Sequence, residues 1–573
     1  LLNYYFFPSP KKSMGHERPN SVSTSAITGV ILLIAQQFGS RLLTFTANQI
    51  LLRYISPDLL GISAQLELFS ITVLFFSRES LRLTLHREQV GSPLVHHLSY
   101  NVEKNDEKKK NPKEPADIRT EAGRIQALVN LAYVCLSLGI VVAFVLAWLY
   151  LRNLNTRDPS ISETPYFKIS LLLVGCASIL ELLAEPSYII AQQMSRHYIR
   201  VATESTATIL RCLISCISAI YARQVGTEIG VLSFALGHLA YSITLLSIYL
   251  WNVIEISSIN AFSLLPRSIY SPNPGEISFS YISRPHLTLS QSFFIQSVFK
   301  YILTQGDTFV ISLLASSRTQ GVYSLANSYG GLLARIVFQP IEESSRNYFG
   351  RLLSTAGKNS HNVISRVHKS LFKIVYTYLI FSIIIVSIGP SAAPLLLKIV
   401  AGSKWSEAGA GQVLGWYCYY IPLLAINGLT EAFVSSVSTK SEVHRQTAWM
   451  LVFSIAFAGA AFFFLKFWEY GAKGLVLANL INMIFRIAWS ITFIQSYLGR
   501  WRESIEFGTL MPRPTTVAAG AVASAALAQT ENNFDGNIFN LCRIGIIAGG
   551  LLIAISIAER KHFLALYHDF NDR

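Results

Sequence analysis

Four arginines fall within or at the edge of long apolar segments of this sequence: Arg53, Arg78, Arg335 and Arg486. A charged side chain near the centre of a bilayer costs about 2.5–3.5 kcal/mol on insertion scales, so it usually faces a partner or a water-filled cavity. The guanidinium group is always charged, and its fork of N–H donors matches the oxygens of a phosphate. Several such groups in one membrane protein favour an anionic, phosphate-bearing substrate.

Carboxylates in the first half of the chain could balance these arginines. Glu181 and Glu185 are one helical turn apart, immediately before Pro186, where a proline frees a backbone carbonyl. They are interpreted as structural partners of a cavity arginine, with proton transfer as the alternative. Glu79 follows Arg78 but should point to another side of the same helix.

The second half offers a similar set of charged residues. Lys300 and Asp307 are seven positions apart, so two turns would place them on one helix face. Glu342 and Glu343 follow a proline near the end of the Arg335 segment. These two glutamates could form a gate latch with basic residues of the facing half, and a plain surface ion pair is the alternative.

The segment around Arg486 carries a polar stripe. Asn482 is one turn before Arg486 and Asn479 lies on the same side, while Glu431 falls in the middle of an earlier apolar segment. A cavity wall explains such a stripe, and hydrogen bonding between helices explains it as well.

The elements that position these residues must be membrane helices. Hydrophobic residues make up 51% of the 573-residue chain and charged residues 14%, with a mean hydropathy of +0.41. Soluble domains carry about 25% charged residues. With about 20 apolar residues per span, we predict an all-α polytopic membrane protein of about fourteen transmembrane helices, centred near 40, 70, 137, 178, 211, 242, 303, 332, 383, 422, 457, 485, 521 and 548.

Composition shifts predict how these helices are grouped around a central cavity. A polar lead is expected first, followed by a six-helix N-lobe that contains a charged loop and then a Pro-containing linker. A six-helix C-lobe, two further helices and a tail complete the chain. The predicted bounds are 1–24 for the lead, 25–255 for the N-lobe with its loop at 84–120, 256–289 for the linker, 290–500 for the C-lobe, 511–558 for the last two helices and 559–573 for the tail.

A weak internal repeat supports the two lobes. A shift of 260 positions pairs Gln36 with Gln296, Thr44 with Thr304 and Gly61 with Gly321. Repeats of this kind, related about an axis along the membrane normal, are typical of transporters.

The net charge of +14 reflects topology rather than nucleic-acid binding. Loops after even-numbered helices, together with both termini, hold about thirty Lys and Arg against about ten on the other side, which predicts cytosolic termini. Basic residues interleaved with aromatic ones in a soluble domain, the pattern of nucleic-acid binders, are absent from the sequence.

No motif for a cofactor or an energy source is found in the sequence. It has no G-x-x-x-x-G-K-[ST] phosphate loop, H-E-x-x-H or G-x-S-x-G, and its six cysteines show no C-x-x-C spacing. We therefore expect neither a metal nor a cofactor, and we do not expect an enzyme.

Six strings, distributed over both lobes, resemble the eukaryotic Rft family of oligosaccharide translocation proteins. This family belongs to the multidrug/oligosaccharidyl-lipid/polysaccharide exporter superfamily. The strings are LFFSRES, ELLAEP, GVYSLAN, ARIVFQPIEES, LLAINGLTEAF and LANLINMIFRI. Departures from the family pattern are modest: the loop at 84–120 is long, Asp307 stands where a glutamate is common, and the last two helices match weakly.

The resemblance implies an endoplasmic reticulum membrane protein of N-glycan assembly. Its expected cargo is the dolichol-pyrophosphate-linked Man(5)GlcNAc(2) intermediate, moved from the cytosolic to the lumenal leaflet. Other proteins of the same pathway are further partners that the resemblance allows, besides membrane lipid. It also implies a cavity role for the four arginines singled out above.

Three alternatives to a flippase are open. A glycolipid chaperone or scaffold would use the same anionic site without moving its cargo. A cation-coupled exporter would depend on Glu181, Glu185 and Asp307. A multi-pass glycosyltransferase is disfavoured, because Ser56-Pro57-Asp58 leaves no room for a lumenal catalytic loop after the first helix.

Overall fold

The structure is a computed structural model, and its described part is almost entirely helical. It describes residues 45–91, 115–118, 120–152, 159–194, 196–259, 262–272, 275–354, 360–501, 503, 507–529 and 538–571. Ten helices among these residues are long and apolar enough to cross a membrane, which confirms the predicted all-α polytopic class. The predicted polar lead, and most of the helix predicted near residue 40, lie outside the described residues.

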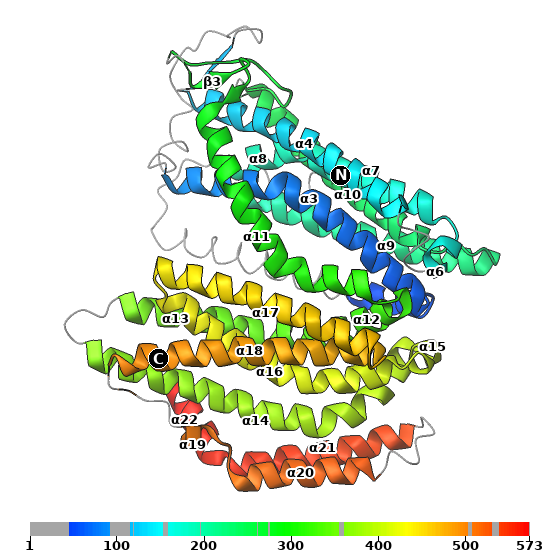
Figure 1. Cartoon of the computed structure of the whole chain (residues 1–573), viewed down its shortest axis with the longest axis vertical. Helices are drawn as coiled ribbons and strands as arrows, with labels where there is room; N and C mark the ends of the chain where they lie inside the picture. The colour runs from blue at the N-terminus through cyan, green and yellow to red at the C-terminus, as the bar shows by residue number, and fades with distance from the viewer. Residues whose placement is uncertain are drawn as a thin grey trace, which may run out of the picture.

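Helices from the first half of the chain pack together as one group (Figure 1). Their buried residues form shared cores, one around Leu81, Leu128 and Ile189 and another around Leu66 and Val174. Residues 45–52 are helical. The helices that follow are α3 (Pro57–Gly91), α4 (Glu121–Arg152), α6 (Pro159–Glu163), α7 (Phe167–Leu183), α8 (Glu185–Gln193), α9 (His197–Val225) and α10 (Leu232–Ile259).

The span formed by α7 and α8 is interrupted. Ala184 separates the two helices, and Pro186 lies in the first turn of α8. Proline cannot donate the backbone hydrogen bond that a continuous helix needs, so the interruption follows from the sequence. It places Glu181 at the end of one helix and Glu185 at the start of the next.

The connection between the two halves is shorter than predicted. Because α10 continues to Ile259 and α11 begins at Arg284, the linker spans 260–283 rather than 256–289. It contains β2 (Ile269–Tyr270), β3 (Ile277–Ser278) and β4 (Ile282–Ser283). β2 pairs in parallel with β1 (Ala116–Asp117), and β3 pairs with β4 in an antiparallel hairpin.

Polar side chains near the start of α4 bind this linker. Asn130 donates to the carbonyl oxygens of Arg267 and Tyr281, at 2.7 and 2.8 Å, and accepts from the backbone N–H of Arg267 at 3.1 Å. Gln126 donates to the Leu265 carbonyl and accepts from the Ser263 backbone N–H. Both side chains are buried, so the linker is fixed to the first group of helices.

The second half forms another group around a large core that includes Phe349, Trp405 and Phe433. Two of its helices begin at side-chain caps. Ser316 accepts from the backbone N–H of Thr319 at the start of α12, and Thr439 forms a capping box with Glu442 at the start of α17. The elements are α11 (Arg284–Leu314), α12 (Ser317–Leu333), the π-helical turn η2 (Ala334–Phe338), α13 (Gln339–Ser354), α14 (Ser360–Ala401), α15 (Ser403–Glu407), α16 (Ala410–Val437), α17 (Lys440–Lys466) and α18 (Gly471–Gly499).

The last helices pack on the outer side of α14. They are α19 (Phe507–Leu510), α20 (Pro514–Ala528), α21 (Ile538–Ala558) and α22 (Arg560–Asn571). Figure 1 shows α20 and α21 side by side below α14, where Ile380, Ala523 and Leu551 share a core. The predicted tail at 559–573 is therefore largely a helix, and Phe563 of α22 packs against this core.

The two groups meet where α3 lies against α11 and α12 (Figure 1). α11 runs obliquely from the linker strands to the start of α12, and along this path it contacts α3 in the first group and α17 in the second. The helices predicted near 303, 332 and 521 are present as α11, the α12–η2–α13 segment and α20, but they are outside the ten candidate spans. The total of fourteen spans stays a prediction.

Candidate functional site

Arg78, on α3, is bound to the two glutamates at the α7–α8 interruption. Its Nη1 donates to Oε1 of Glu181 at 2.6 Å and to Oε1 of Glu185 at 3.2 Å. Only 2% of the Glu185 side chain is exposed. Leaving a buried charge of this kind without a partner would be costly, so these pairs stabilise the first group.

Arg82, one turn further along α3, completes this cluster. Its Nη2 donates to Glu185 at 2.5 Å, and its guanidinium lies 4.3 Å from the ring centroid of Tyr188. Arg200 lies 5.6 Å from the same ring and pairs with Glu204. Arg82, like Tyr188, Arg200 and Glu204, is not among the site residues predicted from the sequence.

A cavity of about 40 Å³ lies inside this cluster. The buried hydroxyl of Tyr249, which lines it, has no hydrogen-bond partner among the described residues. A cavity of this size accommodates water rather than a glycolipid headgroup. The cluster is therefore a structural ion network with a small polar void.

Glu79 and Lys300 form an ion pair that joins α3 to α11. The same two helices share hydrogen bonds between Thr72 and Tyr301 at 2.6 Å and between Ser80 and Ser290 at 3.2 Å. Lys300 is thus turned toward the first group. The sequence predicted that Lys300 and Asp307 share one helix face but gave no partner for either.

Asp307 is half-buried further along α11, and the described residues provide it with neither an ion pair nor a hydrogen bond. Its carboxylate is close enough to Arg486 and Tyr420 to interact electrostatically with both. Arg486 itself donates through Nε and Nη2 to Oε1 of Glu431, at 3.0 and 2.8 Å. Each side chain of this pair is 25% exposed, so the pair stays accessible to solvent.

The two asparagines predicted beside Arg486 are buried between helices. Asn479 donates to the Tyr323 hydroxyl at 2.8 Å and to the backbone of its own helix. Asn482 is 2% exposed, and its Oδ1 has no partner among the described residues. The contact of Asn479 supports the alternative interpretation, hydrogen bonding between helices.

Glu342 and Glu343 differ in their surroundings. Glu342 is half-buried against α16, close enough that a Cβ added at Gly428 would collide with its carboxylate. Glu343 is exposed and accepts from the side chain of Gln339 at 3.0 Å. No ion pair joins either glutamate to the first group of helices within the described residues, so the gate latch stays a prediction.

Arg335 is held differently from Arg78 and Arg486. It is exposed and lies in the π-helical turn η2, where Nε donates to the Gly331 carbonyl at 3.2 Å and Nη2 to the Ser328 carbonyl at 3.1 Å. No carboxylate pairs with it in the described part of the chain. Both of its acceptors belong to its own helix.

Arg53 caps the end of another helix. Its Nε donates to the Val400 carbonyl at 3.2 Å and its Nη2 to the Ile399 carbonyl at 3.4 Å, at the C-terminal end of α14. A cation is favourable there because the last carbonyl groups of a helix carry partial negative charge. Nearby, Trp405 of α15 donates through Nε1 to the Leu52 carbonyl at 2.8 Å.

The four predicted arginines therefore have four separate sets of partners. Arg78 and Arg486 are paired with carboxylates of different groups, Arg53 binds the end of α14, and Arg335 binds only its own helix. No hydrogen bond or ion pair in the described part of the chain links two of them. Neither Arg53 nor Arg335 would have to release a carboxylate to bind a ligand, but the acceptors of Arg53 belong to another helix, whereas those of Arg335 belong to its own.

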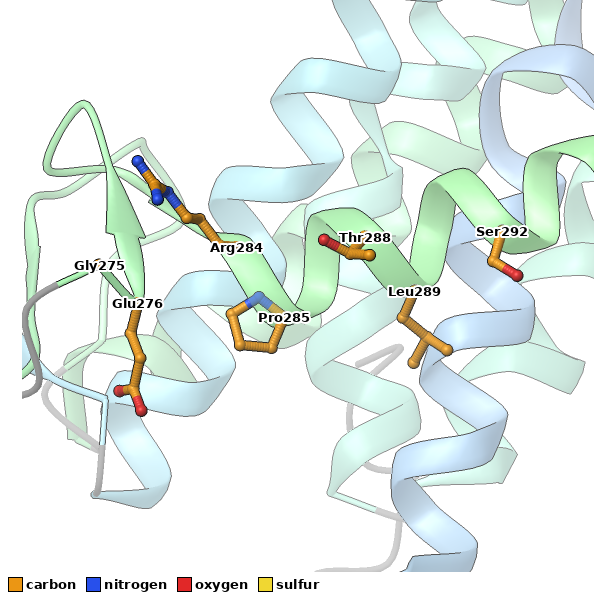
Figure 2. Close-up of a pocket in the computed structure, with 7 residues that line it drawn as sticks. All are labelled: Gly275, Glu276, Arg284, Pro285, Thr288, Leu289 and Ser292. Atoms are coloured by element: carbon orange, nitrogen blue, oxygen red, sulfur yellow. The ribbon is translucent and has the colours of Figure 1, made fainter.

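A larger hollow, of about 550 Å³, lies elsewhere, at the start of α11. Figure 2 shows its lining, in which Glu276 and Arg284 point away from each other and Thr288, Leu289 and Ser292 follow along α11. None of the predicted site residues lines it, and it is open to the surface. We do not assign it to the candidate site.

Comparison with known proteins identifies the family. The model of the family described as "Rft protein" matches residues 25–569. The Man(5)GlcNAc(2)-PP-dolichol translocation protein RFT1 of Yarrowia lipolytica is 33% identical to this chain, over 88% of the chain and 75% of the relative. The proteins of the same name from Saccharomyces cerevisiae and Xenopus tropicalis are 31% and 30% identical, over 93% and 91% of the chain and 94% and 93% of those relatives.

Two solved structures share the fold. The lipid II flippase MurJ in an inward closed conformation has a TM-score of 0.58 and 14% identity, covering 93% of this chain and 99% of that one. A multidrug resistance MATE family transporter in an inward-facing conformation has a TM-score of 0.51 and 13% identity, covering 80% of this chain and 95% of that one. The family match, which spans nearly the whole chain, confirms the resemblance inferred from the sequence motifs: this protein belongs to the Rft family.

Proposed function

We propose that this protein moves the dolichol-pyrophosphate-linked Man(5)GlcNAc(2) intermediate from the cytosolic to the lumenal leaflet of the endoplasmic reticulum membrane. Support comes from relatives at 30–33% identity that are named for this translocation. The chain covers most of the length of those relatives, so it corresponds to most of each protein and not to one part of it. The protein acts as a transporter and not as an enzyme in this account.

The observation that carries the proposal is the state of Arg335. Its guanidinium is exposed, and in the described part of the chain it bonds only to main-chain carbonyl groups of its own helix. Charge-assisted bonds to a pyrophosphate are stronger than bonds to neutral carbonyl groups, so a pyrophosphate can displace them. π-helical turns such as η2 are frequent at functional sites, because they re-orient side chains within a helix.

Arg78 and Arg486 have a supporting role in this proposal. Each is already neutralised by glutamate, so binding a pyrophosphate there would require the release of a carboxylate. The Arg486–Glu431 pair is partly accessible and lies in the same group of helices as Arg335. We assign it to the polar wall along which the sugars pass, while the dolichol chain stays in lipid.

Movement in this account is downhill. The sequence has no phosphate-loop motif for ATP, so consumption of the glycolipid in the lumen would provide the direction. The bias of Lys and Arg toward one side places the termini, the Glu342 region and the loop at 84–120 in the cytosol. The start of α3 then lies on the lumenal side.

A binding measurement tests the site. Purified protein in nanodiscs is titrated with the fluorescent glycolipid, and Arg335→Ala is compared with Arg445→Ala, which removes an exposed arginine at the start of α17. Loss of a charged hydrogen-bond donor should weaken binding about tenfold or more for Arg335→Ala only. Equal affinities for the two variants would reject Arg335 as the pyrophosphate site.

Complementation tests the pathway. The chain replaces its relative in Saccharomyces cerevisiae, and the occupancy of N-glycosylation sites on a secreted glycoprotein is measured. Normal occupancy with the parent chain, together with low occupancy and accumulated Man(5)GlcNAc(2) glycolipid with Arg335→Ala, is expected. If the well-expressed parent chain fails to restore occupancy, the assignment to this pathway is wrong.

A further inference from the structure

Main-chain atoms of α3 and α12 meet at two glycines. A Cβ atom added at Gly61 would lie 1.8 Å from the carbonyl oxygen of Ser317, and a Cβ added at Gly321 would lie 1.8 Å from the carbonyl oxygen of Pro57. Any other residue at either position would collide with backbone that cannot move independently. The two helices therefore cross as closely as helices can.

This contact is reciprocal, and the internal repeat explains why. Gly61 and Gly321 are separated by the same 260 positions that separate Pro57 and Ser317. Each half of the chain thus contributes the same local unit, a helix start followed four residues later by glycine. Each unit packs its glycine on the other's first carbonyl group, as expected for equivalent elements related by a two-fold axis.

A buried amide pair extends the contact by one turn. Nε2 of Gln65 donates to Oε1 of Gln320 at 2.9 Å, and the two side chains belong to residues that are 5% and 3% exposed. The amide oxygen of Gln65, Oε1, accepts a further hydrogen bond from the Tyr150 hydroxyl. Separating the helices here would expose these amides to water, which can satisfy them at little cost.

The Arg53 and Trp405 bonds lie at the same end of the molecule. Arg53, four residues before Pro57, binds the last carbonyl groups of α14, and Trp405 of α15 binds the Leu52 carbonyl. Figure 1 shows the start of α3, α12 and α15 together at the right-hand end. Every one of these bonds joins the first half of the chain to the second.

Further along α3, its described hydrogen bonds to the second half of the chain go to α11 and not to α12. The remaining inter-half hydrogen bonds described for α3 go to α11, through Thr72–Tyr301, Glu79–Lys300 and Ser80–Ser290. α11 is tied at one end to the first group through β4 and α4, and at the other to α17 of the second group. It can therefore act as the hinge about which α3 and α12 separate.

We propose that the crossing of Gly61 and Gly321, latched by the Gln65–Gln320 pair and by Arg53, is the lumenal gate of this protein. The inference rests on the proposed translocation and assigns Arg53 to the gate rather than to the pyrophosphate. The crossing consists of main-chain van der Waals contacts, apolar packing of Leu52 and Leu60 on the core of the second group, and a few hydrogen bonds. It can therefore open without unpairing a buried charge. The glycines fix the register at which it closes again.

The first test measures gate opening without any glycolipid transport. In a background with all six cysteines replaced by alanine, Ser317→Cys introduces a near-isosteric probe at a position that is fully buried at the crossing. A water-soluble maleimide should label it slowly. Gly321→Ala, and the reciprocal Gly61→Ala, should raise the labelling rate about tenfold or more by forcing the helices apart.

The matched control is Gly459→Ala, because a Cβ added at Gly459 in α17 meets no atom within 4 Å. It should leave the labelling rate unchanged. Size-exclusion profile and unfolding temperature identify variants that fail to fold. Labelling rates that stay at the parent value in folded Gly321→Ala and Gly61→Ala would overturn the proposal.

The second test locks the gate. Gln65→Cys combined with Gln320→Cys in the same background should be bridged by a short bis(methanethiosulfonate) cross-linker, because the two parent side chains span the gap between the helices with their amide ends 2.9 Å apart. Glycolipid translocation in vesicles should stop on cross-linking and return after reduction, while each single cysteine variant is unaffected by either treatment. Translocation at the unlocked rate in the fully cross-linked protein would contradict the gate.

The two tests separate this inference from the proposed function. If glycolipid is translocated neither by the reduced protein nor by the cross-linked protein, the proposed function fails. The labelling comparison then still decides whether the glycine crossing opens.

Discussion

Arginine inside a membrane protein needs an acceptor, and this chain satisfies the need in three ways. Arg78 and Arg486 use carboxylates, Arg53 uses the end of a neighbouring helix, and Arg335 uses its own helix. The cost of an unpaired charge in the bilayer explains why all four have partners. It does not make all four substrate ligands. Arg335 is the best candidate because its acceptors are neutral carbonyl groups of its own helix, whereas the carbonyl groups bound by Arg53 join two helices.

Arg486 should therefore matter for stability in a way that Arg335 does not. Arg486→Ala leaves Glu431 partly buried without its cation, which should lower the free energy of unfolding by about 1–3 kcal/mol. Among the described contacts, Arg335→Ala removes only bonds to carbonyl groups of its own helix. The free energy of unfolding of this variant should therefore stay near that of the parent. Unfolding of both variants is followed by thermal denaturation in the same detergent.

A double variant, Glu431→Gln with Arg486→Gln, provides the control for this comparison. Since removing both charges leaves neither one unpaired, the double variant should be more stable than Arg486→Ala. An Arg335→Ala protein as unstable as Arg486→Ala would show that the distinction between the two arginines is wrong.

At the scale of elements, buried amides fix the linker to α4. Asn130→Ala removes three hydrogen bonds to linker backbone and leaves buried polar groups unsatisfied, which should cost about 1–3 kcal/mol locally. Tryptic cleavage after Arg267 should become faster. Asn252→Ala is the matched control, because among the described residues the Asn252 side chain bonds only to the Ile248 carbonyl of its own helix.

Equal cleavage rates in Asn130→Ala and Asn252→Ala would mean that the linker is held by other contacts. The strand pairing between β1 and β2 is the first candidate for such contacts.

Glu559, between α21 and α22, is a glutamate with a depressed pKa. Burial by itself would raise the pKa of Glu559, but hydrogen bonds from Thr516, Tyr376 and the Arg513 backbone N–H, with the Arg513 charge, lower it below the ordinary value of 4.5. A carboxylate with a lowered pKa stabilises the fold above its ordinary pKa. This contribution is lost as the pH falls through the folded-state value.

Glu559→Gln should accordingly lower the unfolding temperature at pH 7, and its difference from the parent should narrow as the pH falls from about 5 to about 3. Unfolding temperatures measured across this range in detergent give the comparison. Glu407→Gln, at an exposed position in α15, serves as the control. A difference that is constant with pH would show that the ionised carboxylate is not what stabilises this contact.

The part of the fold that could be predicted from the sequence is mainly the position of the membrane spans and of the break between α7 and α8. Long apolar stretches predict where the spans lie, and Pro186 predicts the interruption between α7 and α8. α22 could not be predicted in this way, because its polar, mixed sequence looks like that of a tail. The contact that fixes it, between Phe563 and the core beside α14, is visible only in the folded protein. The same holds for the linker strands, which are two residues long and pair with β1 and with each other, while Asn130 of α4 binds linker backbone beside them.

Pairing between distant helices could not be predicted from the sequence. Lys300 meets Glu79, which is 221 positions earlier, because α11 lies along α3. Arg53 meets α14, 346 positions later, for a similar reason. The partners of Arg78 were within reach of prediction, since Glu181 and Glu185 flank a helix interruption, whereas Tyr188 and Arg200 join them only through the packing of α8 and α9.

The molecule as a whole combines two groups of helices, a bridging helix and one tight crossing. Contacts between the halves gather at the end where α3 and α12 begin, and α11 connects the groups along its length. Such an arrangement favours movement of one group against the other about α11, which a scaffold would not need.

Translocation by the purified protein is the most direct measurement of this account. Vesicles with labelled Man(5)GlcNAc(2)-PP-dolichol in both leaflets are treated with a mannosidase that cannot enter them. Without protein, only the outer-leaflet glycolipid should be trimmed. With this protein, nearly all of the glycolipid should be trimmed. The Arg335→Ala variant should lower the rate at which inner-leaflet glycolipid is trimmed about tenfold or more.

Arg445→Ala should match the parent protein in the same vesicles. Protection of the inner-leaflet glycolipid that persists with correctly folded, membrane-inserted parent protein would contradict the account and favour a glycolipid-binding scaffold.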